Sequence, residues 1–286
     1  MVEPCMEHRA RVAWLLVLVA ALAGVAPTSI AVSRLTGNAV LAAQAQTAPA
    51  AGVLLWTGQE ATIEESLRTL KIDRIETVPI GVTKPKRAFF PSGAPLASAT
   101  WKPLQPGVRK GYWESYKSEI AAYELDKLLG MQMVPPAVER EIDSEKGAVI
   151  LWLDGVKGWN MKEPVRGPEP EWSRQVSRMK LFDQLIANID RNAGNLLYDD
   201  SWHLFLIDHS RAFTDRTDLK GTGPIQTVDP KLWDRINAVT RDDLDRVVGP
   251  WLDGRAIGAI LTRRDKMRDE INKRVAKLGE AGVFLK

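Results

Sequence analysis

The sequence predicts an α+β fold of two lobes, in which a small strand-rich lobe is followed by a helical lobe. Short strand-like runs separated by proline and glycine turns fill residues 72–104. An apolar run at residues 147–153 indicates one more buried strand. Beyond residue 172, helical spacing of apolar residues dominates. We therefore place the small lobe at residues 60–153 and the helical lobe at residues 154–286.

Composition excludes several classes of function. The chain of 286 residues has 39 basic and 36 acidic side chains, a formal net charge of +3. That balance, without a basic run interleaved with aromatics, predicts no nucleic-acid partner. The single cysteine, Cys5, lies near the start, and only His8, His203 and His209 are histidines. We therefore expect no disulfide, cysteine nucleophile or zinc cluster in the main domain.

The first residues have the pattern of an export signal. Arg9 and Arg11 precede an apolar run at residues 12–26, and residues 43–45 read Ala-Gln-Ala, a cleavage pattern for signal peptidase. Residues 1–45 are predicted to be a signal peptide or an uncleaved membrane anchor, and residues 46–59 a linker. Either alternative places the rest of the chain outside the cytoplasm, because the positive flank stays inside. The protein is expected to be exported, and association with a membrane would occur through this segment.

The small lobe is expected to begin with a short amphipathic helix and to contain one longer helix among its strands. The longer helix ends at Gly130, because glycine commonly follows a last helical turn. The expected helices cover residues 60–70 and 116–129, and the expected strands or extended runs cover residues 75–82, 87–90, 96–101, 134–140 and 147–153.

The helical lobe is expected to begin with the clearest helix of the chain, at residues 172–189, where six apolar residues recur at helical spacing. A polar loop follows, and then two strands at residues 196–198 and 202–207 with a turn between them. Residues 230–278 are predicted to be largely helical and amphipathic.

Two charged residues of the small lobe are candidates for phosphoryl-transfer chemistry, which needs a lysine to hold phosphates and a carboxylate to hold that lysine. Lys102 ends a predicted strand, and Glu119 lies on the next helix, where an ion pair between them is geometrically feasible. Taken singly, each is better explained as an ordinary surface charge.

The helical lobe supplies the other candidates. Residues 190–195, DRNAGN, place an acid and an amide five positions apart, after a helix and before a hairpin. Asp190 would orient an acceptor hydroxyl, and Asn195 would bind a metal ion, although a polar turn explains this segment about as well. Asp208 closes an apolar strand, where a carboxylate needs a partner, and Mg²⁺ or Mn²⁺ is a natural one. Their order along the chain predicts an ATP-dependent, metal-assisted kinase.

These segments resemble known kinase families. Residues 118–129, SEIAAYELDKLL, with residues 134–140, VPPAVER, resemble the secretory-pathway (Golgi casein) kinase family. Residues 183–191, DQLIANIDR, with Asn195 and Asp208, are similar to that family, to the type II phosphatidylinositol 4-kinases and to the HipA-like bacterial kinases. Trp-Lys-Pro around Lys102 also resembles the Phe-Lys-Pro of the lipid kinases.

The resemblance implies a two-lobed protein-kinase-like fold and a role for each matched residue. It implies that Lys102 binds phosphate, that Glu119 is its partner or a metal ligand, and that Asp190 is the catalytic acid or base. Asn195 and Asp208 would be metal ligands. We further assign nucleotide contacts to Lys84, Trp152 and Leu153. The chain departs from the families in lacking a G-x-G-x-x-G before Lys102, so that the basic turn at Lys84 would cover the phosphates.

Several alternatives stay open at this point. A protein Ser or Thr hydroxyl is the preferred acceptor, because residues 118–129 most resemble the Golgi kinases. A phosphoinositide or small-molecule acceptor is the alternative, with the basic residues 84–87 as a membrane contact. A pseudokinase that binds nucleotide without turnover is a third reading. The sequence leaves the oligomeric state open.

Overall fold

The computed structural model describes residues 56–78, 85–159, 165–219 and 223–286. The chain divides into two units, Met1–Gln46 and Thr47–Lys286, and all described residues belong to the second. The predicted signal segment, most of the predicted linker and Lys84 lie outside the described residues. Within the described residues, no helix has the length and apolar character to cross a membrane.

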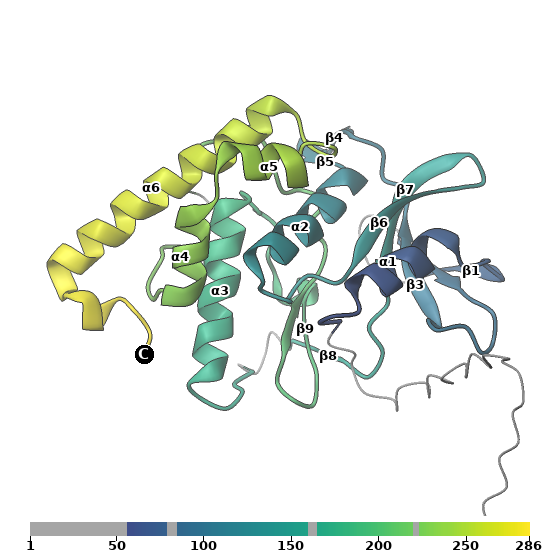
Figure 1. Ribbon diagram of the computed structural model, residues 1–286, viewed down its shortest axis with the longest axis horizontal. Helices are drawn as coiled ribbons and strands as arrows, with labels where there is room; N and C mark the ends of the chain where they lie inside the picture. Colours follow the sequence, from purple (N-terminus) through teal and green to yellow (C-terminus); the bar gives the residue numbers. More distant parts are fainter. Residues whose placement is uncertain (1–55, 79–84, 160–164, 220–222) are drawn as a thin grey trace, which may run out of the picture. The chain divides into compact units, whose positions relative to one another are not determined.

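The first part of the described chain forms a five-stranded antiparallel sheet in the order β1-β2-β3-β7-β6 (Figure 1). Its strands are β1 (Arg74–Thr77), β2 (Lys86–Phe89), β3 (Ser98–Lys102), β6 (Ala137–Ile142) and β7 (Glu145–Leu151). Helix α1 (Glu60–Thr69) packs against β6 and β7. The middle strand, β3, is buried along most of its length and ends with Lys102 opposite Ala148 of β7. The sheet therefore places a buried lysine at the end of its middle strand.

Helix α2 (Tyr116–Leu129) has the bounds that the sequence predicts. The Ser115 side chain accepts a hydrogen bond from the Lys117 N–H and caps the first turn. Gly130 ends the helix with a φ of 60°, a left-handed conformation that glycine adopts without a steric penalty. Because α2 is packed on most of its circumference, even its charged residue Glu119 is buried.

A two-stranded hairpin, β4 (Gly107–Arg109) and β5 (Tyr112–Glu114), connects β3 to α2. Its turn residues Lys110 and Gly111 both have positive φ, 50° and 83°, as a two-residue hairpin turn requires. The sequence carries no signal for this hairpin, because its strands have three residues each and lack a clear apolar alternation.

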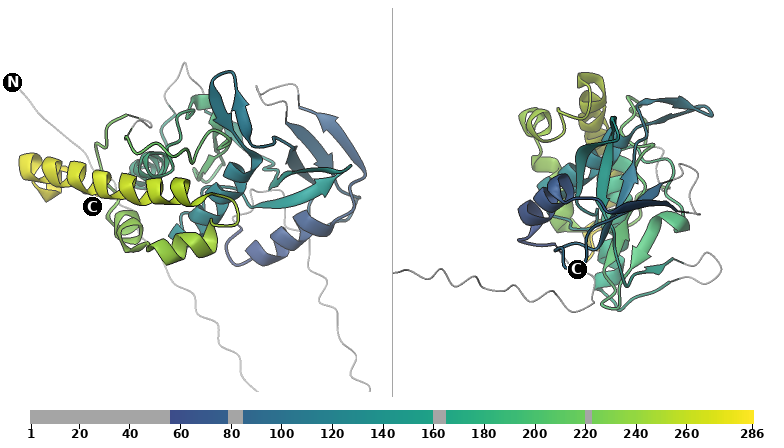
Figure 2. Two further views of the ribbon diagram at one scale, coloured as in Figure 1. Left: turned by 90° about the horizontal axis from the view of Figure 1, so that it is seen from above. Right: turned by 90° about the vertical axis from the view of Figure 1, so that its right-hand side faces the viewer.

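The remaining elements form the helical lobe, with a three-stranded sheet of order β10-β9-β8 beside α3. Figure 2 shows α6 as a long yellow helix along this lobe, away from the five-stranded sheet. The elements are β8 (Lys157–Gly158), α3 (Glu171–Leu185), the 3-10 turn η1 (Ala193–Asn195), β9 (Leu196–Tyr198), β10 (Leu204–Leu206), α4 (Pro230–Ala238), α5 (Arg241–Val247), α6 (Gly254–Leu278) and η2 (Glu280–Gly282).

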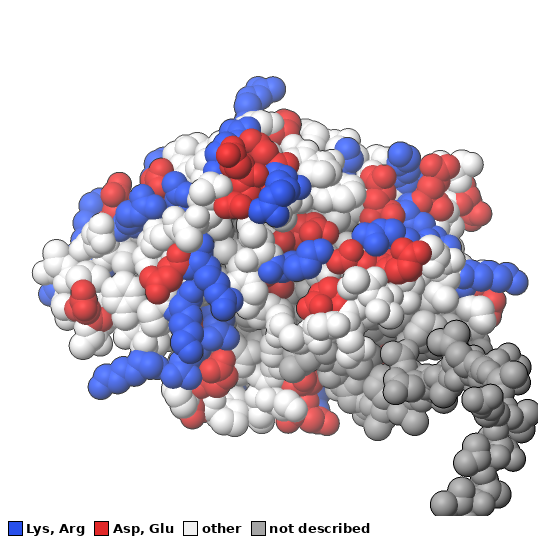
Figure 3. Space-filling model, in the orientation of Figure 1, with Lys and Arg blue, Asp and Glu red and all other residues white. Residues whose placement is uncertain are grey.

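Two apolar clusters correspond to the two lobes. One joins α1 to the five-stranded sheet, and the larger joins α2 to the helices of the second lobe. Helix α2 thus lies between the lobes, because it contacts β6 and β7 of the sheet as well as α4 and α5. On the face seen in Figure 3, basic and acidic side chains are interspersed, in keeping with the balanced charge of the chain.

Helix α3 ends four residues earlier than the apolar spacing predicts. It stops at Leu185, and Ala187 adopts a positive φ of 51°. The buried Asn188 amide donates to the Asp183 carboxylate at 2.9 Å, which holds a turn in place of another helical turn. Ile189, expected on the packed face, is 39% exposed. A side-chain bond therefore overrides the periodicity.

Helix α6 supports the chain that follows β10. Arg263 is fully buried, and its Nε donates to the Leu185 carbonyl at 2.8 Å. Its Nη1 donates to the carbonyls of Thr214 and Arg216. Burial lowers the pKa of Arg263 to about 10, which still leaves it charged at neutral pH. The C-terminal helix therefore anchors the end of α3 and residues 214–216 together.

Candidate active site

Three charged side chains from distant parts of the chain meet at the end of β3. The Lys102 Nζ lies 2.6 Å from Glu119 Oε1 and 2.7 Å from Asp208 Oδ1. Lys102 and Glu119 are 5% and 3% exposed, whereas Asp208 is 28% exposed. The ion pair that the sequence analysis considers feasible is therefore present, and Asp208 joins it from the solvent side.

Burial and charge act in opposite directions within this cluster. Burial works to lower the pKa of the Lys102 ammonium, but the two carboxylates outweigh it and hold that pKa well above its usual value. Burial works to raise the pKa of Glu119, but the Lys102 ammonium outweighs it and holds that pKa well below its usual range. Both groups are therefore charged, and removal of one would leave the other buried without its counter-ion.

The chain after β10 is fixed against α2. The second oxygen of Glu119 accepts the His209 backbone N–H at 2.9 Å. The Ser210 hydroxyl donates to Asp208 Oδ1 at 3.0 Å, and Asp208 itself adopts a positive φ of 58°. This unusual conformation for a non-glycine residue is held by bonds on both sides of it. The Asp208 carboxylate is therefore oriented by the Ser210 hydroxyl and the Lys102 ammonium.

Asp190 lies in the loop between α3 and η1, and its backbone is held by two amides. The side-chain amides of Asn192 and Asn195 both donate to the Asp190 carbonyl at 3.0 Å. Its carboxylate is 36% exposed, and Oδ2 lies 3.1 Å from Arg211 Nη1. The backbone of Asp190 is therefore held in place while its carboxylate is accessible to a substrate.

Arg191 joins this loop to the cluster at Lys102. Its guanidinium binds both oxygens of the buried Asp183, at 2.9 and 3.1 Å. It also donates to the carbonyls of Asn195 and Ile207, both at 2.8 Å. With a side chain only 2% exposed, Arg191 fixes the predicted catalytic loop against the end of β10.

His209 links Arg191 to Glu119. The Arg191 Nη2 lies 2.8 Å from His209 Nε2, and because a guanidinium only donates, Nε2 accepts and the ring proton is on Nδ1. That Nδ1 faces Glu119 Oε2 at 3.8 Å. Burial lowers the pKa of His209, and Glu119 opposes this effect. His209 therefore contacts Arg191 through its ring and Glu119 through its backbone N–H.

Asn195 and Asp208, the predicted metal ligands, lie on neighbouring backbone segments, because the Ile207 N–H donates to the Asn195 carbonyl at 3.2 Å. Within the described residues, no group of three or more His, Cys, Asp or Glu side chains could hold a metal ion. An amide and a carboxylate oxygen, completed by substrate phosphates and water, are nevertheless a donor set that Mg²⁺ and Mn²⁺ accept.

Trp152 and Leu153, the other predicted nucleotide contacts, directly follow β7. Because Leu151 pairs with Ala99 and Ala148 with Lys102, they lie at the opposite end of β3 from the lysine, roughly 13 Å away along the strand. The Arg87 guanidinium covers the Trp152 ring at 4.0 Å, and Leu153 packs on the small-lobe core. Their contact with nucleotide stays a prediction.

Sequence reasoning missed the residues that hold the site together. A carboxylate within the apolar helix that ends at residue 185 could have indicated Asp183, and proximity to Asp190 could have indicated Arg191. No sequence signal relates Arg211 to Glu114, which lie 97 positions apart and form an ion pair at 2.8 Å.

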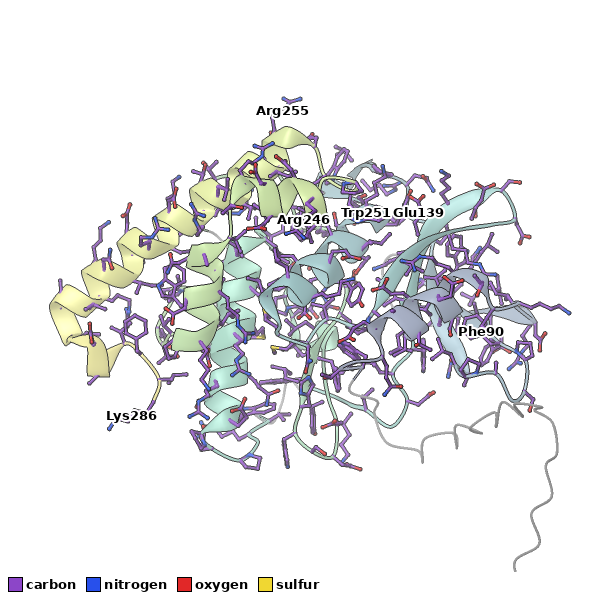
Figure 4. The ribbon with its side chains drawn as sticks, viewed as in Figure 1. Phe90, Glu139, Arg246, Trp251, Arg255 and Lys286 are labelled. Carbon is purple, nitrogen blue, oxygen red and sulfur yellow. The ribbon has the colours of Figure 1, made fainter. Side chains whose placement is uncertain are left out.

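A groove of about 680 Å³ lies between the β4–β5 hairpin and the beginning of α6. Its lining includes Trp113 and Lys117, residues 213–216, and Trp251 and Arg255. Figure 4 labels Arg255 in the first turn of α6 and Trp251 in the segment between α5 and α6. The groove therefore borders the segment that continues from Asp208.

Solved structures share this architecture. No family model and no curated protein matches the sequence. The crystal structure of the Golgi casein kinase with Mn/ADP bound aligns with a TM-score of 0.61 and 14% identity, over 80% of this chain and 79% of that one. The structure of hydra Fam20 with sugar aligns with a TM-score of 0.59 and 16% identity, over 80% and 92%.

A more distant match is the Helicobacter pylori proinflammatory kinase CtkA, with a TM-score of 0.50 and 11% identity over 74% of this chain and 98% of that one. The chain therefore has a kinase-like fold, which confirms the predicted two-lobed architecture. At these identities the matches establish the fold alone. The resemblance to the type II lipid kinases and the HipA-like kinases stays a prediction from the sequence.

Proposed function

We propose that the protein is an ATP-dependent, metal-assisted kinase that transfers a phosphoryl group to an alcohol. The observation that carries this proposal is the contact of Lys102 with both Glu119 and Asp208, at 2.6 and 2.7 Å. A kinase needs a buried lysine that is held by a carboxylate and placed beside a metal-binding acid. The kinase-like fold supports the same assignment.

In this proposal each residue has one task. Lys102 binds the phosphates of ATP, and Asp190 orients the acceptor hydroxyl and takes its proton. The acceptor oxygen forms a bond to the γ-phosphorus while the bond to the β,γ-bridging oxygen breaks and ADP leaves. Asn195 and Asp208 would hold Mg²⁺ or Mn²⁺, which when bound neutralises charge on the phosphates. The Golgi casein kinase, solved with Mn/ADP bound, supports this choice of nucleotide and metal.

A protein Ser or Thr hydroxyl is the proposed acceptor, supported by the likeness to a casein kinase. A phosphoinositide or small alcohol is the alternative acceptor, and a pseudokinase is the alternative without turnover. The proposed location is outside the cytoplasm, which the arginine-flanked apolar run at residues 12–26 supports. Fractionation of cells that express the full chain checks this, and recovery of uncleaved protein in the cytosol would refute it.

The decisive experiment measures nucleotide binding and phosphate transfer separately. Wild type with Mn²⁺ or Mg²⁺ and ATP is expected to gain thermal stability and to label a mixed Ser/Thr protein acceptor, with phosphoinositide vesicles and glycerol as parallel acceptors. Asp190→Asn is expected to lose transfer by about 10³-fold and to keep nucleotide binding. Asp208→Asn is expected to lose the metal-dependent stabilisation as well.

The outcomes separate the alternatives. Nucleotide stabilisation without transfer to any acceptor would establish the pseudokinase. Neither stabilisation nor transfer by the wild type would refute the proposal. The matched control is Arg246→Met, which removes an exposed arginine that pairs with Asp243 on α5, and it is expected to behave as wild type.

A further inference from the structure

Arg211, three positions after Asp208, joins Asp190 to the β4–β5 hairpin. Its Nη1 lies 3.1 Å from Asp190 Oδ2. Its Nε and Nη2 both reach Glu114 Oε1, at 2.9 and 2.8 Å. Its guanidinium also lies over the Tyr112 ring, 4.6 Å from the ring centre. One side chain therefore contacts the proposed catalytic acid and both ends of β5.

The contacts of Arg211 are largely shielded from water. The Arg211 side chain is 16% exposed and that of Glu114 is 6% exposed. Burial works to lower the pKa of Arg211, but Glu114 and Asp190 outweigh it and raise that pKa, so the residue stays cationic. Electrostatic attraction is stronger in such surroundings than in water. The attraction between Arg211 and Glu114 is therefore stronger than that in an ion pair exposed to water.

The hairpin end is itself fixed to the segment that carries Arg211. Glu114 directly precedes Ser115, which caps α2 and donates its backbone N–H to the Ser210 carbonyl at 2.9 Å. Ser118 Oγ donates to the Ala212 carbonyl at 3.2 Å. Backbone and side-chain bonds thus hold Glu114 and Arg211 in one rigid unit, which makes Glu114 a fixed point from which Arg211 reaches Asp190.

We propose that Arg211, anchored by Glu114 and Tyr112 of the hairpin, is a positioning residue that holds the Asp190 carboxylate in its working orientation. This inference rests on the proposed function. The guanidinium occupies Oδ2 of Asp190, so that Oδ1 is the oxygen presented to the acceptor hydroxyl. Because Asp190 is 36% exposed, its side chain would otherwise be free to rotate in water. Arg211 acts on the acceptor side and has no part in nucleotide binding.

The test uses the full chain and measures kcat and the KM values for ATP and for the acceptor that the wild type labels. Arg211→Met is expected to lower kcat about 10- to 100-fold and to leave the KM for ATP within about twofold. Arg211→Lys is expected to restore only part of kcat, because an ammonium cannot span two carboxylates with a planar fork. Glu114→Gln is expected to lower kcat less than Arg211→Met does. Arg246→Met serves as the control for loss of an arginine.

A double mutant distinguishes a positioning role of Arg211, which acts through Asp190, from a purely structural role. In the Asp190→Asn background, Arg211→Met is expected to cause no further loss of transfer, because its effect passes through that carboxylate. Thermal unfolding verifies that each variant is folded, and if Arg211→Met is not, Arg211→Lys and Glu114→Gln carry the test.

Three outcomes overturn the inference. The first is a kcat of folded Arg211→Met within twofold of wild type. The second is a change in the KM for ATP as large as the change in kcat. The third is a loss of transfer by Arg211→Met in the Asp190→Asn background as large as its loss in the wild-type background. If the wild type transfers no phosphate, the proposed function fails and this inference with it. An active wild type with an unaffected Arg211→Met refutes this inference alone.

Discussion

Two charged networks meet at residues 208–211, and they differ in their access to water. The inner network joins Lys102, Glu119 and Asp208 through His209 to Arg191 and Asp183, and most of its side chains are at most 5% exposed. The outer network joins Glu114 and Arg211 to Asp190, whose carboxylate is 36% exposed.

The difference teaches which contacts stabilise the fold and which act on the reaction. In the inner network Lys102, Glu119, Arg191 and Asp183 are buried, so truncating one of them leaves a buried charge without a partner. In the outer network water can solvate Asp190 when its partner is removed, so the cost to stability is small. We therefore expect the inner network to govern both stability and activity, and Asp190 of the outer network to govern activity alone.

The largest expected effect on stability comes from Arg191→Met. It leaves the buried Asp183 with the Asn188 amide as its one side-chain partner among the described residues, so the free energy of unfolding should fall by about 3–5 kcal/mol. Urea denaturation measures this value. Arg246→Met, at an exposed ion pair, should change it by less than about 1 kcal/mol. A loss below about 1 kcal/mol for Arg191→Met would remove the distinction between the two networks.

A smaller effect, which depends on pH, is expected from Glu119→Gln. The pKa of Glu119 is depressed in the folded state, so its contribution to stability is present above about pH 4.3 and is lost as the pH falls below that value. The free energy of unfolding of the wild type should exceed that of Glu119→Gln by about 2–4 kcal/mol at pH 7, and this difference should become smaller towards pH 3.

Urea denaturation of the two proteins at pH 7, 5, 4 and 3 checks this dependence on pH. Glu76→Gln, at an exposed pair with Arg74, is the matched control and should differ from wild type by less than about 1 kcal/mol throughout. A gap between wild type and Glu119→Gln that stays constant with pH would contradict an ionised Glu119 in the folded protein.

The smallest expected effect on stability is that of Asp190→Asn in the outer network. The amide can still accept a hydrogen bond from Arg211, and the site is open to water, so the free energy of unfolding should change by less than about 1 kcal/mol. The same variant is expected to lose phosphate transfer. If urea denaturation finds a loss above about 2 kcal/mol, Asp190 belongs with the inner network and the comparison fails.

Much of the architecture could be predicted from local sequence. The bounds of α2 follow from the Ser115 cap and Gly130, both of which act within one helical turn. The end of α3 could not be predicted, because the bond between Asn188 and Asp183 competes with apolar spacing that continues to Ile189. The β4–β5 hairpin was missed because its three-residue strands are too short for a period to appear.

The candidate site likewise has features that the sequence predicts and features that only the structure shows. The sequence by itself determined the residue types and their order, Lys102, Glu119, Asp190, Asn195 and Asp208, because each lies in, ends or follows an element with a local signal. Only the tertiary structure decided that Asp208 meets Lys102 across 106 positions and that Arg211 ties Asp190 to Glu114 across the lobe boundary. Such contacts depend on how buried elements pack, and a buried charge takes its partner from whichever segment the packing brings beside it.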